Sequence, residues 1–321
     1  RGTHKPEVSG SIPLPATNIG FKVTNFEELT VIIVTYKTNR KILYNCINSI
    51  NNQIKIIIIE NNNDVLLKKE IETKFENVKV ILSKENLGYG GGNNLGIKHA
   101  NTRYVFISNP DTVYSKDFFQ NIKYYINSDL EFSLIGASYP NHDNYLSYGG
   151  FTNKITEQYK KKEYNNFGLK DVDWVVGCSM LLDLKNINMS ILFDENFFFF
   201  YEETDLCRRI KKLEGKIFNS NKLIVNHLGQ SGSIGSDKDL KLEAEKFRNW
   251  HLMWSEYYYY RKHNGFLSAF RKIIGKLIRS MFKILFFTIT NQKEKKTIYQ
   301  YRFSGIINSF LGKKSWYRIK K

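Results

Sequence analysis

The 321-residue chain has few cysteines and prolines and no long apolar run. Its three cysteines, Cys46, Cys178 and Cys207, lie far apart without Cys-x-x-Cys spacing, which argues against a zinc site or a disulfide framework and favours a reducing compartment. No run of about 18 uncharged apolar residues occurs, and the first residues lack the apolar core of a signal peptide. We therefore expect a cytoplasmic protein without a spanning helix.

Three of the five prolines fall within residues 1–20, which show no periodicity and do not begin with Met. We interpret residues 1–25 as a flexible leader or an expression remnant. The fold prediction accordingly begins at residue 26.

Acidic residues are scarce in the last quarter of the chain. The formal net charge is +17, and residues 241–321 hold 19 Lys and Arg against 4 Asp and Glu, whereas residues 1–240 hold 29 against 27. The basicity therefore belongs to a C-terminal region, residues 241–321, and not to the main domain, residues 26–240.

Strand and helix patterns alternate from residue 30 onward. Residues 30–36 form a β-branched run typical of a strand buried on both faces, and residues 54–64 and 78–82 hold two more. Apolar residues at helical spacing lie between these runs, within residues 42–50 and 65–76. This alternation predicts an α/β fold with a mostly parallel sheet flanked by helices.

Polar groups follow each predicted strand, at the edge where parallel sheets bind ligands. The first strand ends at Thr35 and Tyr36, and the second ends at Glu60 and Asn61. A fourth strand, residues 104–108, runs into the Asn-Pro-Asp of residues 109–111. We expect these groups to share one rim.

Residues 85–99, ENLGYGGGNNLGIKH, are rich in glycine. A GxGxxG dinucleotide fingerprint follows the first strand of its unit, whereas these glycines follow the third, and Gly90 and Gly92 lack a matching third glycine. A dehydrogenase-type site is therefore disfavoured.

Two later segments also read as strands. Residues 172–183 resemble a buried strand pair broken at Gly177, where the backbone can approach a ligand closely. After the segment KIFNS at residues 216–220, residues 222–227 form a strand that ends at His227 before a Gly/Ser loop. This position makes His227 a candidate rim residue, although a lone histidine is more often a structural hydrogen-bonder.

The stretch FFFFYEETDLCRRI, residues 197–210, sets aromatic rings against the carboxylates of Glu202, Glu203 and Asp205. Burying an unpaired carboxylate costs several kcal/mol, so the pattern needs a cause. One interpretation is a helix start, with acids in the first turn and Asp205 paired to an arginine one turn on. The other is an active-site carboxylate whose partial burial tunes its pKa for general-base work.

These segments, taken in order, resemble the inverting family 2 glycosyltransferases, which have a GT-A fold, and in particular the bacterial rhamnosyltransferase-type members that build lipid-linked surface glycans. The resemblance covers about residues 29–232. It is carried by TVIIVTYKTN, ENNND, ENLGYGGGNNLGI, SNPDT, DWVVGCSMLL, FDENFFFFYEETDLCRR and VNHLGQSGS.

The resemblance implies transfer of L-rhamnose from dTDP-L-rhamnose to a lipid-linked glycan acceptor. An alternative within the family is a hexose or N-acetylhexosamine from a UDP-sugar. The alternative from another class is a non-catalytic membrane- or nucleic-acid-binding protein on a degenerate transferase scaffold.

The resemblance also implies roles for individual residues. Asp111 and His227 would hold Mg²⁺ or Mn²⁺ on the donor diphosphate, where a cation neutralises developing charge. Glu203 would deprotonate the acceptor hydroxyl, or Glu202 or Asp205 would share that role. The nucleotide-sugar site would comprise Thr35, Tyr36, Glu60, Asn86, Gly88, Gly92, Asn93, Asn109 and Gly177.

Three positions depart from the family pattern. Glu203 and Glu60 each stand where aspartate is usual, one methylene longer. Asn109 replaces the first acid of the metal motif, which leaves Asp111 as the only carboxylate there.

The basic C-terminal region contains an amphipathic pattern. Four cations recur at helical spacing within residues 265–290: Lys272, Lys276, Arg279 and Lys283. The rest of that surface is Leu, Ile, Phe and Met, and Trp250, Trp254 and the tyrosines at 257–260 suit the same setting, a helix in an anionic membrane interface. We expect peripheral association with the inner face of the cell membrane.

Two other interpretations of this region are open. The helix could pack on the main domain with its basic face in water. Nucleic-acid binding is disfavoured because no recognised module surrounds the tail.

Overall fold

The computed structural model describes residues 26–140, 146–147, 164–187, 192–227 and 238–318. The expected leader, residues 1–25, and the Gly/Ser loop after His227 lie outside the described residues.

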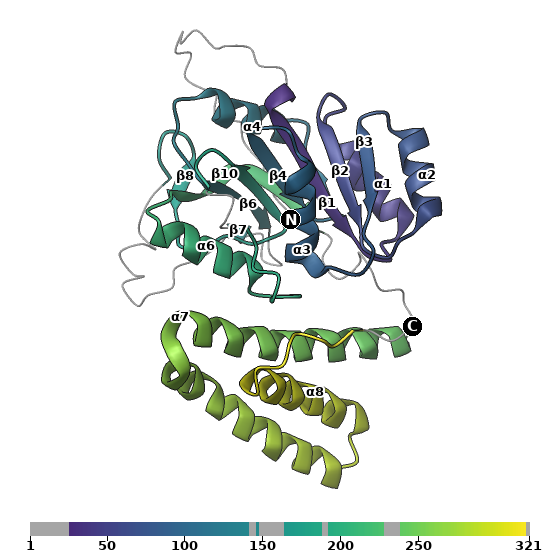
Figure 1. Cartoon of the computed structure of the whole chain (residues 1–321), viewed down its shortest axis with the longest axis vertical. Helices are drawn as coiled ribbons and strands as arrows, with labels where there is room; N and C mark the ends of the chain where they lie inside the picture. The colour runs from purple at the N-terminus through teal and green to yellow at the C-terminus, as the bar shows by residue number, and fades with distance from the viewer. Residues whose placement is uncertain (1–25, 141–145, 148–163, 188–191, 228–237, 319–321) are drawn as a thin grey trace, which may run out of the picture.

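A twisted sheet forms the centre of the larger part of the molecule (Figure 1). Its strand order is β3-β2-β1-β4-β9-β6-β10-β5, with β7 beside β6 and β8 beside β10. The strands are β1 (Leu29–Thr35), β2 (Lys55–Glu60), β3 (Val78–Leu82), β4 (Tyr104–Ser108), β5 (Thr112–Tyr114), β6 (Leu134–Pro140), β7 (Leu146–Ser147), β8 (Leu169–Asp171), β9 (Ser179–Asp183) and β10 (Ile217–His227).

The first four strands are parallel, as the sequence predicts. Thr35 pairs with Glu60, so the carboxyl ends of β1 and β2 lie at one edge. Strand β9 is antiparallel to β4, with Ser108 opposite Ser179, which brings the start of β9 to the same edge.

Helices cover both faces of this sheet. They are α1 (Arg40–Ser49), α2 (Val65–Lys74), α3 (Gly88–His99), α4 (Phe118–Asn127) and α6 (Glu202–Lys212), preceded by a short 3-10 turn at Phe26–Glu28. Val31 and Ile33 enter the core shared with α1, α2 and α4, whereas Ile32 enters the core shared with α3 and α6. Alternate side chains of β1 thus face two apolar layers, which explains its unbroken β-branched sequence.

Most of the glycine-rich segment forms a helix, α3. A Cβ atom at Gly92 would lie 2.7 Å from Cγ1 of Val34. The missing side chain therefore allows α3 to approach β1 closely.

Two strand predictions need correction. Residues 172–178 form no regular strand, and the expected pair reduces to β9. The strand expected at residues 222–227 is part of a longer strand, β10, whose register against β6 shifts between Asn219 and Ile224. Such an irregularity bends a strand without ending it.

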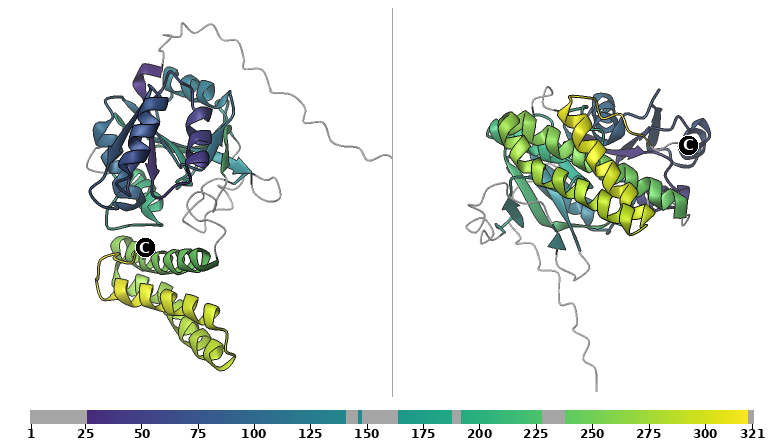
Figure 2. Two further views of the ribbon diagram at one scale, coloured as in Figure 1. Left: turned by 90° about the vertical axis from the view of Figure 1, so that its right-hand side faces the viewer. Right: turned by 90° about the horizontal axis from the view of Figure 1, so that it is seen from below.

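The C-terminal region folds as a separate helical layer, below the carboxyl ends of the parallel strands in Figure 1 and beneath the sheet domain in Figure 2. Helix α7 (Lys238–Ile289) breaks at Gly265, where φ is 79° and ψ is 172°, and α8 (Lys293–Phe310) follows. Helix α8 packs against both halves of α7 through a core of Met253, Tyr257, Ala269, Ile273 and Ile306.

The aromatic residues of the first half of α7 are core residues, so the expectation that they lie in a membrane interface is wrong. Trp250, Trp254, Tyr257 and Tyr259 are at most 3% exposed. The Nε1 atom of Trp250 donates a hydrogen bond to Ser304 Oγ at 3.2 Å. Within the described ranges, no helix has an apolar stretch long enough to cross a bilayer.

Candidate active site

The Asn-Pro-Asp segment and His227 meet at the rim of the sheet. Strand β5 follows Asp111 directly and pairs antiparallel with β10, with Thr112 opposite His227. The Nε2 atom of His227 therefore lies 3.3 Å from Oδ1 of Asp111, which is 6% exposed, and 3.4 Å from Nδ2 of Asn109. The two predicted metal ligands are neighbours although 115 positions separate them in the sequence.

These two donors suit a divalent cation. A carboxylate oxygen and an imidazole nitrogen about 3 Å apart can occupy adjacent positions around an ion with bonds of about 2.0–2.2 Å. Across the described part of the chain, no group of three His, Cys, Asp or Glu side chains forms a complete metal cage. The pair thus fits an ion that takes its other ligands from a bound phosphate group or water.

A second acidic group lies at the start of α6. Tyr201 has a φ of 69°, and this left-handed residue leads into a first turn containing Glu202 and Glu203. A Cβ atom at Gly177 would lie 3.4 Å from Cβ of Glu203, and the Gly177 carbonyl accepts a hydrogen bond from the hydroxyl of Tyr89. Gly177 thus contacts the acidic group, as a position of close backbone approach.

The two glutamates differ in their expected protonation. Burial raises the pKa of Glu203. Burial and then the charge of Glu203 raise the pKa of Glu202 well above its ordinary range, and Oε2 of Glu202 is buried without a hydrogen-bond partner among the described residues. Glu202 is therefore the one of the two that favours its protonated form more strongly, because it is the more buried carboxyl group and lies next to the charge of Glu203.

Cys178 connects the two acidic groups. Its carbonyl accepts a hydrogen bond from the backbone N–H of Asn109 at 2.9 Å. Burial raises the pKa of its thiol to about 12, and the charges of Asp111 and Glu203 both act in the same direction. Both carboxylates therefore lie within electrostatic reach of one residue at the strand edge.

Two of the predicted nucleotide-binding residues have structural partners. The hydroxyl of Thr35 is buried and donates to the carbonyl of Ile59 at 3.4 Å. The carboxylate of Glu60 accepts backbone N–H groups of Asn62 at 3.0 Å and Asp64 at 2.7 Å, so it stabilises the turn after β2. Its burial raises its pKa, although these hydrogen bonds oppose that effect.

The residues around the start of α3 form the wall beside that turn. Oδ1 of Asn86 accepts the N–H of Gly88 at 3.0 Å, and Gly88 has a φ of 73°. Nδ2 of Asn93 donates to the Tyr89 carbonyl at 3.0 Å, while its Oδ1 is buried without a partner in the described ranges.

Asn61, expected from the sequence as a rim group at the end of the second strand, belongs to this wall. Its Nδ2 donates to the Gly88 carbonyl at 3.1 Å, and its Oδ1 accepts the hydroxyl of Ser83 at 3.1 Å. It thus joins the ends of β2 and β3 to α3. Its place next to Glu60, directly after a buried strand, is the signal that identifies it.

Asp205 lies in a different environment from the two glutamates. Its fully buried carboxylate accepts Nε of Arg209 at 2.7 Å, Nζ of Lys262 at 2.6 Å and Nε2 of His263 at 2.7 Å. Burial alone would raise the pKa of Asp205, but hydrogen bonds from His263 and Lys262 and the charge of Arg209 lower it to about 2. The helix-start interpretation therefore holds for Asp205, and a shared general-base role does not fit its contacts.

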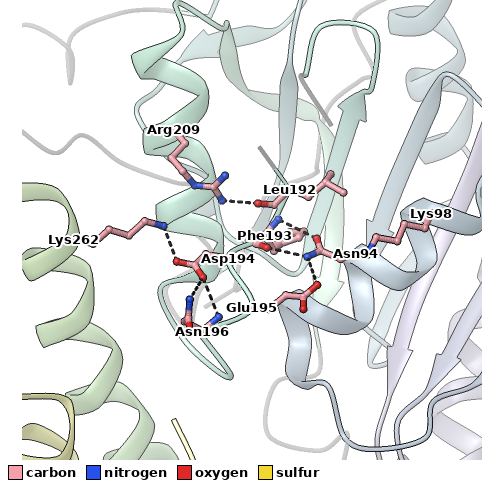
Figure 3. Close-up of a pocket in the computed structure, with 9 residues that line it drawn as sticks. All are labelled: Asn94, Lys98, Leu192, Phe193, Asp194, Glu195, Asn196, Arg209 and Lys262. Atoms are coloured by element: carbon pink, nitrogen blue, oxygen red, sulfur yellow. Dashed lines mark hydrogen bonds and ion pairs between the residues drawn. The ribbon is translucent and has the colours of Figure 1, made fainter. Parts of the chain in front are cut away.

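A hollow of about 520 Å³ lies beside this ion cluster (Figure 3). It is lined by Asn94, Lys98, Leu192, Phe193, Asp194, Glu195, Asn196, Arg209 and Lys262. Lys262 reaches Asp194 at 2.8 Å and Arg209 reaches the Leu192 carbonyl at 2.7 Å. These contacts hold the loop before α6 in place. Lys262 and Arg209, two of the cations that line the hollow, are therefore already bound to protein groups.

A mostly parallel sheet flanked by helices on both faces, with a carboxylate–histidine pair and an acidic helix start near its strand edge, has the GT-A fold of the solved structures that it resembles. A mannosyltransferase from Pyrobaculum calidifontis, solved with GDP-Man and Mn²⁺, superposes with a TM-score of 0.51 at 10% identity and covers 92% of each chain. GalNAc-T7, solved with UDP, GalNAc and Mn²⁺, gives a TM-score of 0.51 at 12% identity over 70% of this chain and 50% of its own.

The chain matches the model of glycosyl transferase family 2 over residues 30–185. It is also 26% identical over 201 residues to the low-salt glycan biosynthesis hexosyltransferase Agl10 of Haloferax volcanii, a match that spans 59% of this chain and 63% of that relative.

The Asp205 cluster predicts a stability effect. We expect Asp205→Asn to lower the free energy of unfolding by about 2–4 kcal/mol at pH 7, because it leaves buried cations without their counter-charge. The low pKa of Asp205 adds stability that is present above the unfolded-state pKa near 4 and is lost as pH falls towards 2. The difference between wild type and variant in chemical denaturation should therefore shrink over that pH range.

The control is Glu245→Gln, which removes the charge of a partly exposed carboxylate that lies 4.0 Å from Arg248 and keeps an oxygen to accept Nδ2 of Asn249. Its unfolding should match that of the wild type. Equal stability of Asp205→Asn and wild type at pH 7 would contradict the structural role.

Proposed function

We propose that this protein is a metal-dependent, inverting glycosyltransferase that moves a sugar from a nucleoside-diphosphate donor to an acceptor hydroxyl. The observation that supports this most strongly is geometric: Asp111 and His227 lie 3.3 Å apart, the N–H of the neighbouring Asn109 donates to the Cys178 carbonyl, and Gly177, next to Cys178, contacts Glu203. One group suits a cation on a diphosphate, and the other suits proton removal.

In this proposal, Asp111 and His227 hold Mg²⁺ or Mn²⁺ through one carboxylate oxygen and one imidazole nitrogen. When bound, the ion supplies positive charge against the negative charge of the leaving diphosphate. Glu203 accepts the proton of the acceptor hydroxyl, and its burial increases its affinity for that proton. A direct displacement with inversion needs one base and no second carboxylate nucleophile.

Glu202 has a supporting part in this proposal. As a neutral acid beside Glu203, it excludes water from the base without adding a second negative charge. Gly177 and Tyr89 complete the wall of the same recess. The part of the proposed site that binds the nucleotide sugar consists of Thr35, Tyr36, Glu60, Asn86, Gly88, Asn93 and Asn109.

For the donor we propose dTDP-L-rhamnose, on the resemblance of the seven motifs to rhamnosyltransferase-type members of the family. A UDP-hexose is the second candidate, and it is favoured by the similarity to a hexosyltransferase of glycan biosynthesis. Both candidates share a nucleoside diphosphate leaving group, so both rest on the same site.

We further propose a lipid-linked acceptor and attachment to an anionic membrane through the second half of α7. That half presents apolar side chains to solvent that are 46–76% exposed and lie about one turn apart: Ile278, Met281, Phe282, Leu285, Phe286 and Ile289. An apolar face flanked by cations suits the boundary between headgroups and acyl chains.

The cationic stripe expected from the sequence is partly used within the protein. Lys276 pairs with Glu256 at 2.5 Å, and Lys272 lies over the ring of Tyr260. The apolar residues are therefore the stronger support for membrane attachment.

Two substitutions test the proposed chemistry. We expect Glu203→Gln and Asp111→Asn each to lower kcat for sugar transfer by roughly 10²- to 10⁴-fold, because one removes the base and the other the anionic cation ligand. Transfer from radiolabelled dTDP- or UDP-sugars in the presence of Mn²⁺ measures this. Circular dichroism verifies that the variants fold, and full activity of a folded variant would remove that residue from the mechanism.

The two glutamates are separated by a pH experiment. Activity of the wild type should fall on acidification with an apparent pKa above the ordinary glutamate value of about 4.3, because the proton must leave Glu203. Glu202→Gln should keep that acid limb in place, because glutamine mimics a carboxyl group that is already neutral.

Stability should change in a way that matches this assignment. Because the pKa of Glu202 is raised in the folded state, this residue lowers the free energy of unfolding increasingly as pH rises above its unfolded-state pKa, so Glu202→Gln should raise Tm more at pH 8 than at pH 5.

Loss of activity in Glu202→Gln together with retained activity in Glu203→Gln would assign the base to Glu202 instead.

Membrane attachment is tested with anionic vesicles. We expect the double variant Phe282→Asp and Leu285→Asp to reduce co-sedimentation with vesicles containing phosphatidylglycerol by about 10-fold or more, because two apolar contacts are lost. Leu66→Asp is the matched control, since Leu66 is 73% exposed but lies on α2. Unchanged binding of the double variant would exclude this face.

A further inference from the structure

The segment after α8 returns along α7 towards the sheet domain, as the yellow trace of Figure 1 shows. The Lys313 carbonyl accepts Nε1 of Trp254 at 3.0 Å. His251 fixes the next turn, with Ser315 Oγ 2.9 Å from its Nδ1 and the Tyr317 carbonyl 2.8 Å from its Nε2. The ring of Tyr317 is buried beside Trp250, so the backbone up to this residue is held in place.

The hydrogen bonds of His251 define its protonation. Its Nε2 must donate to the Tyr317 carbonyl, which leaves Nδ1 to accept the hydroxyl of Ser315. Burial lowers the pKa of His251 to about 3, so the ring stays neutral at physiological pH. The position of the segment therefore does not depend on a histidine charge.

This segment delivers Arg318 to the start of α3. The guanidinium carbon lies 3.3 Å from the ring centroid of Phe198. The same Phe198 accepts the N–H of Tyr89 through its carbonyl at 3.3 Å, and its ring would contact a Cβ atom at Gly88 at 2.8 Å. Arg318 is thus one side chain away from the glycine-rich wall of the proposed donor site.

The pKa of Arg318 is influenced by groups at the same rim. Burial lowers its pKa to about 10, whereas Glu85 and Tyr36 act in the opposite direction. Arg318 therefore remains a cation near neutral pH, close to the end of β1 and to the loop before α3.

The guanidinium has an edge available for a ligand. Its Nη1 donates to the carbonyls of Ser315 at 2.8 Å and Tyr317 at 3.0 Å, and one planar face lies on Phe198. Among the described residues, no hydrogen-bond acceptor pairs with Nε or Nη2 of Arg318. Two parallel N–H groups of this kind match two phosphate oxygens.

We propose that Arg318 is a donor-binding residue, supplied by the C-terminal segment, that binds the diphosphate of the nucleotide sugar beside Tyr36 and Gly88. This inference rests on the proposed transferase function and deepens it. The N-terminus of α3 at Gly88 adds partial positive charge at the same place. The helical region then completes the donor site as well as contacting the membrane.

Isothermal titration of the full chain tests this with UDP and dTDP, and with uridine and thymidine, all in Mg²⁺. Arg318→Met should weaken diphosphate binding about 10-fold or more and leave nucleoside binding unchanged. Arg318→Lys should be intermediate, because it keeps the charge but loses the planar pair of donors. Lys314→Met is the control, an exposed cation on the same segment, and should bind like the wild type.

The outcomes separate the inference from the function on which it rests. If the wild type binds UDP or dTDP and Arg318→Met binds it equally well, the role of Arg318 is wrong and the transferase proposal stands. Equal weakening of diphosphate and nucleoside binding would also overturn a diphosphate contact. If the wild type binds neither nucleotide, the proposed function fails and this inference fails with it.

Discussion

The buried ion cluster around Asp205 is the interaction on which the arrangement of the two parts depends. Asp205 stands two residues after Glu203 on α6, and its carboxylate binds Lys262 and His263 of α7. A carboxylate without exposed surface is tolerated only when cations and hydrogen-bond donors surround it. The helix that carries the proposed base is therefore held from one side by the sheet domain and from the other by the helical layer.

The contacts next to this cluster extend the same attachment. Ser255 donates to the carbonyl of Phe199, and Tyr258 packs edge-on against Phe197. The aromatic run of residues 197–201 is thus a surface on which α7 docks, and the acids that follow it begin α6.

The sequence predicts the sheet well and the helical layer poorly, for a physical reason. Parallel strands can be predicted from local β-branched runs. Because the carboxyl ends of such strands share an edge, the sequence also predicts that Asp111 lies near the end of β1. Two of the three partners of Asp205, Lys262 and His263, lie more than 50 residues away, and no local pattern distinguishes Lys262 from any other lysine of the helical layer. Trp250 and Trp254 show the same difficulty, since an interfacial aromatic residue and a core aromatic residue look alike until α8 is seen to cover them.

The break at Gly265 divides α7 into two halves with different surroundings. In the half before Gly265, Lys262 forms ion pairs with Asp205 of α6 and with Asp194 of the loop that precedes α6, and the aromatic side chains are buried. After it, Phe282, Leu285 and Ile289 are exposed, and cations lie beside them. Since α8 packs on both halves, a force applied to the exposed half would reach the docked half through a shared apolar core and not through a flexible linker. A membrane-bound orientation of the second half would consequently fix the orientation of α6 and of the strand edge, so that an acceptor held in the same membrane would meet Glu203 from a constant direction.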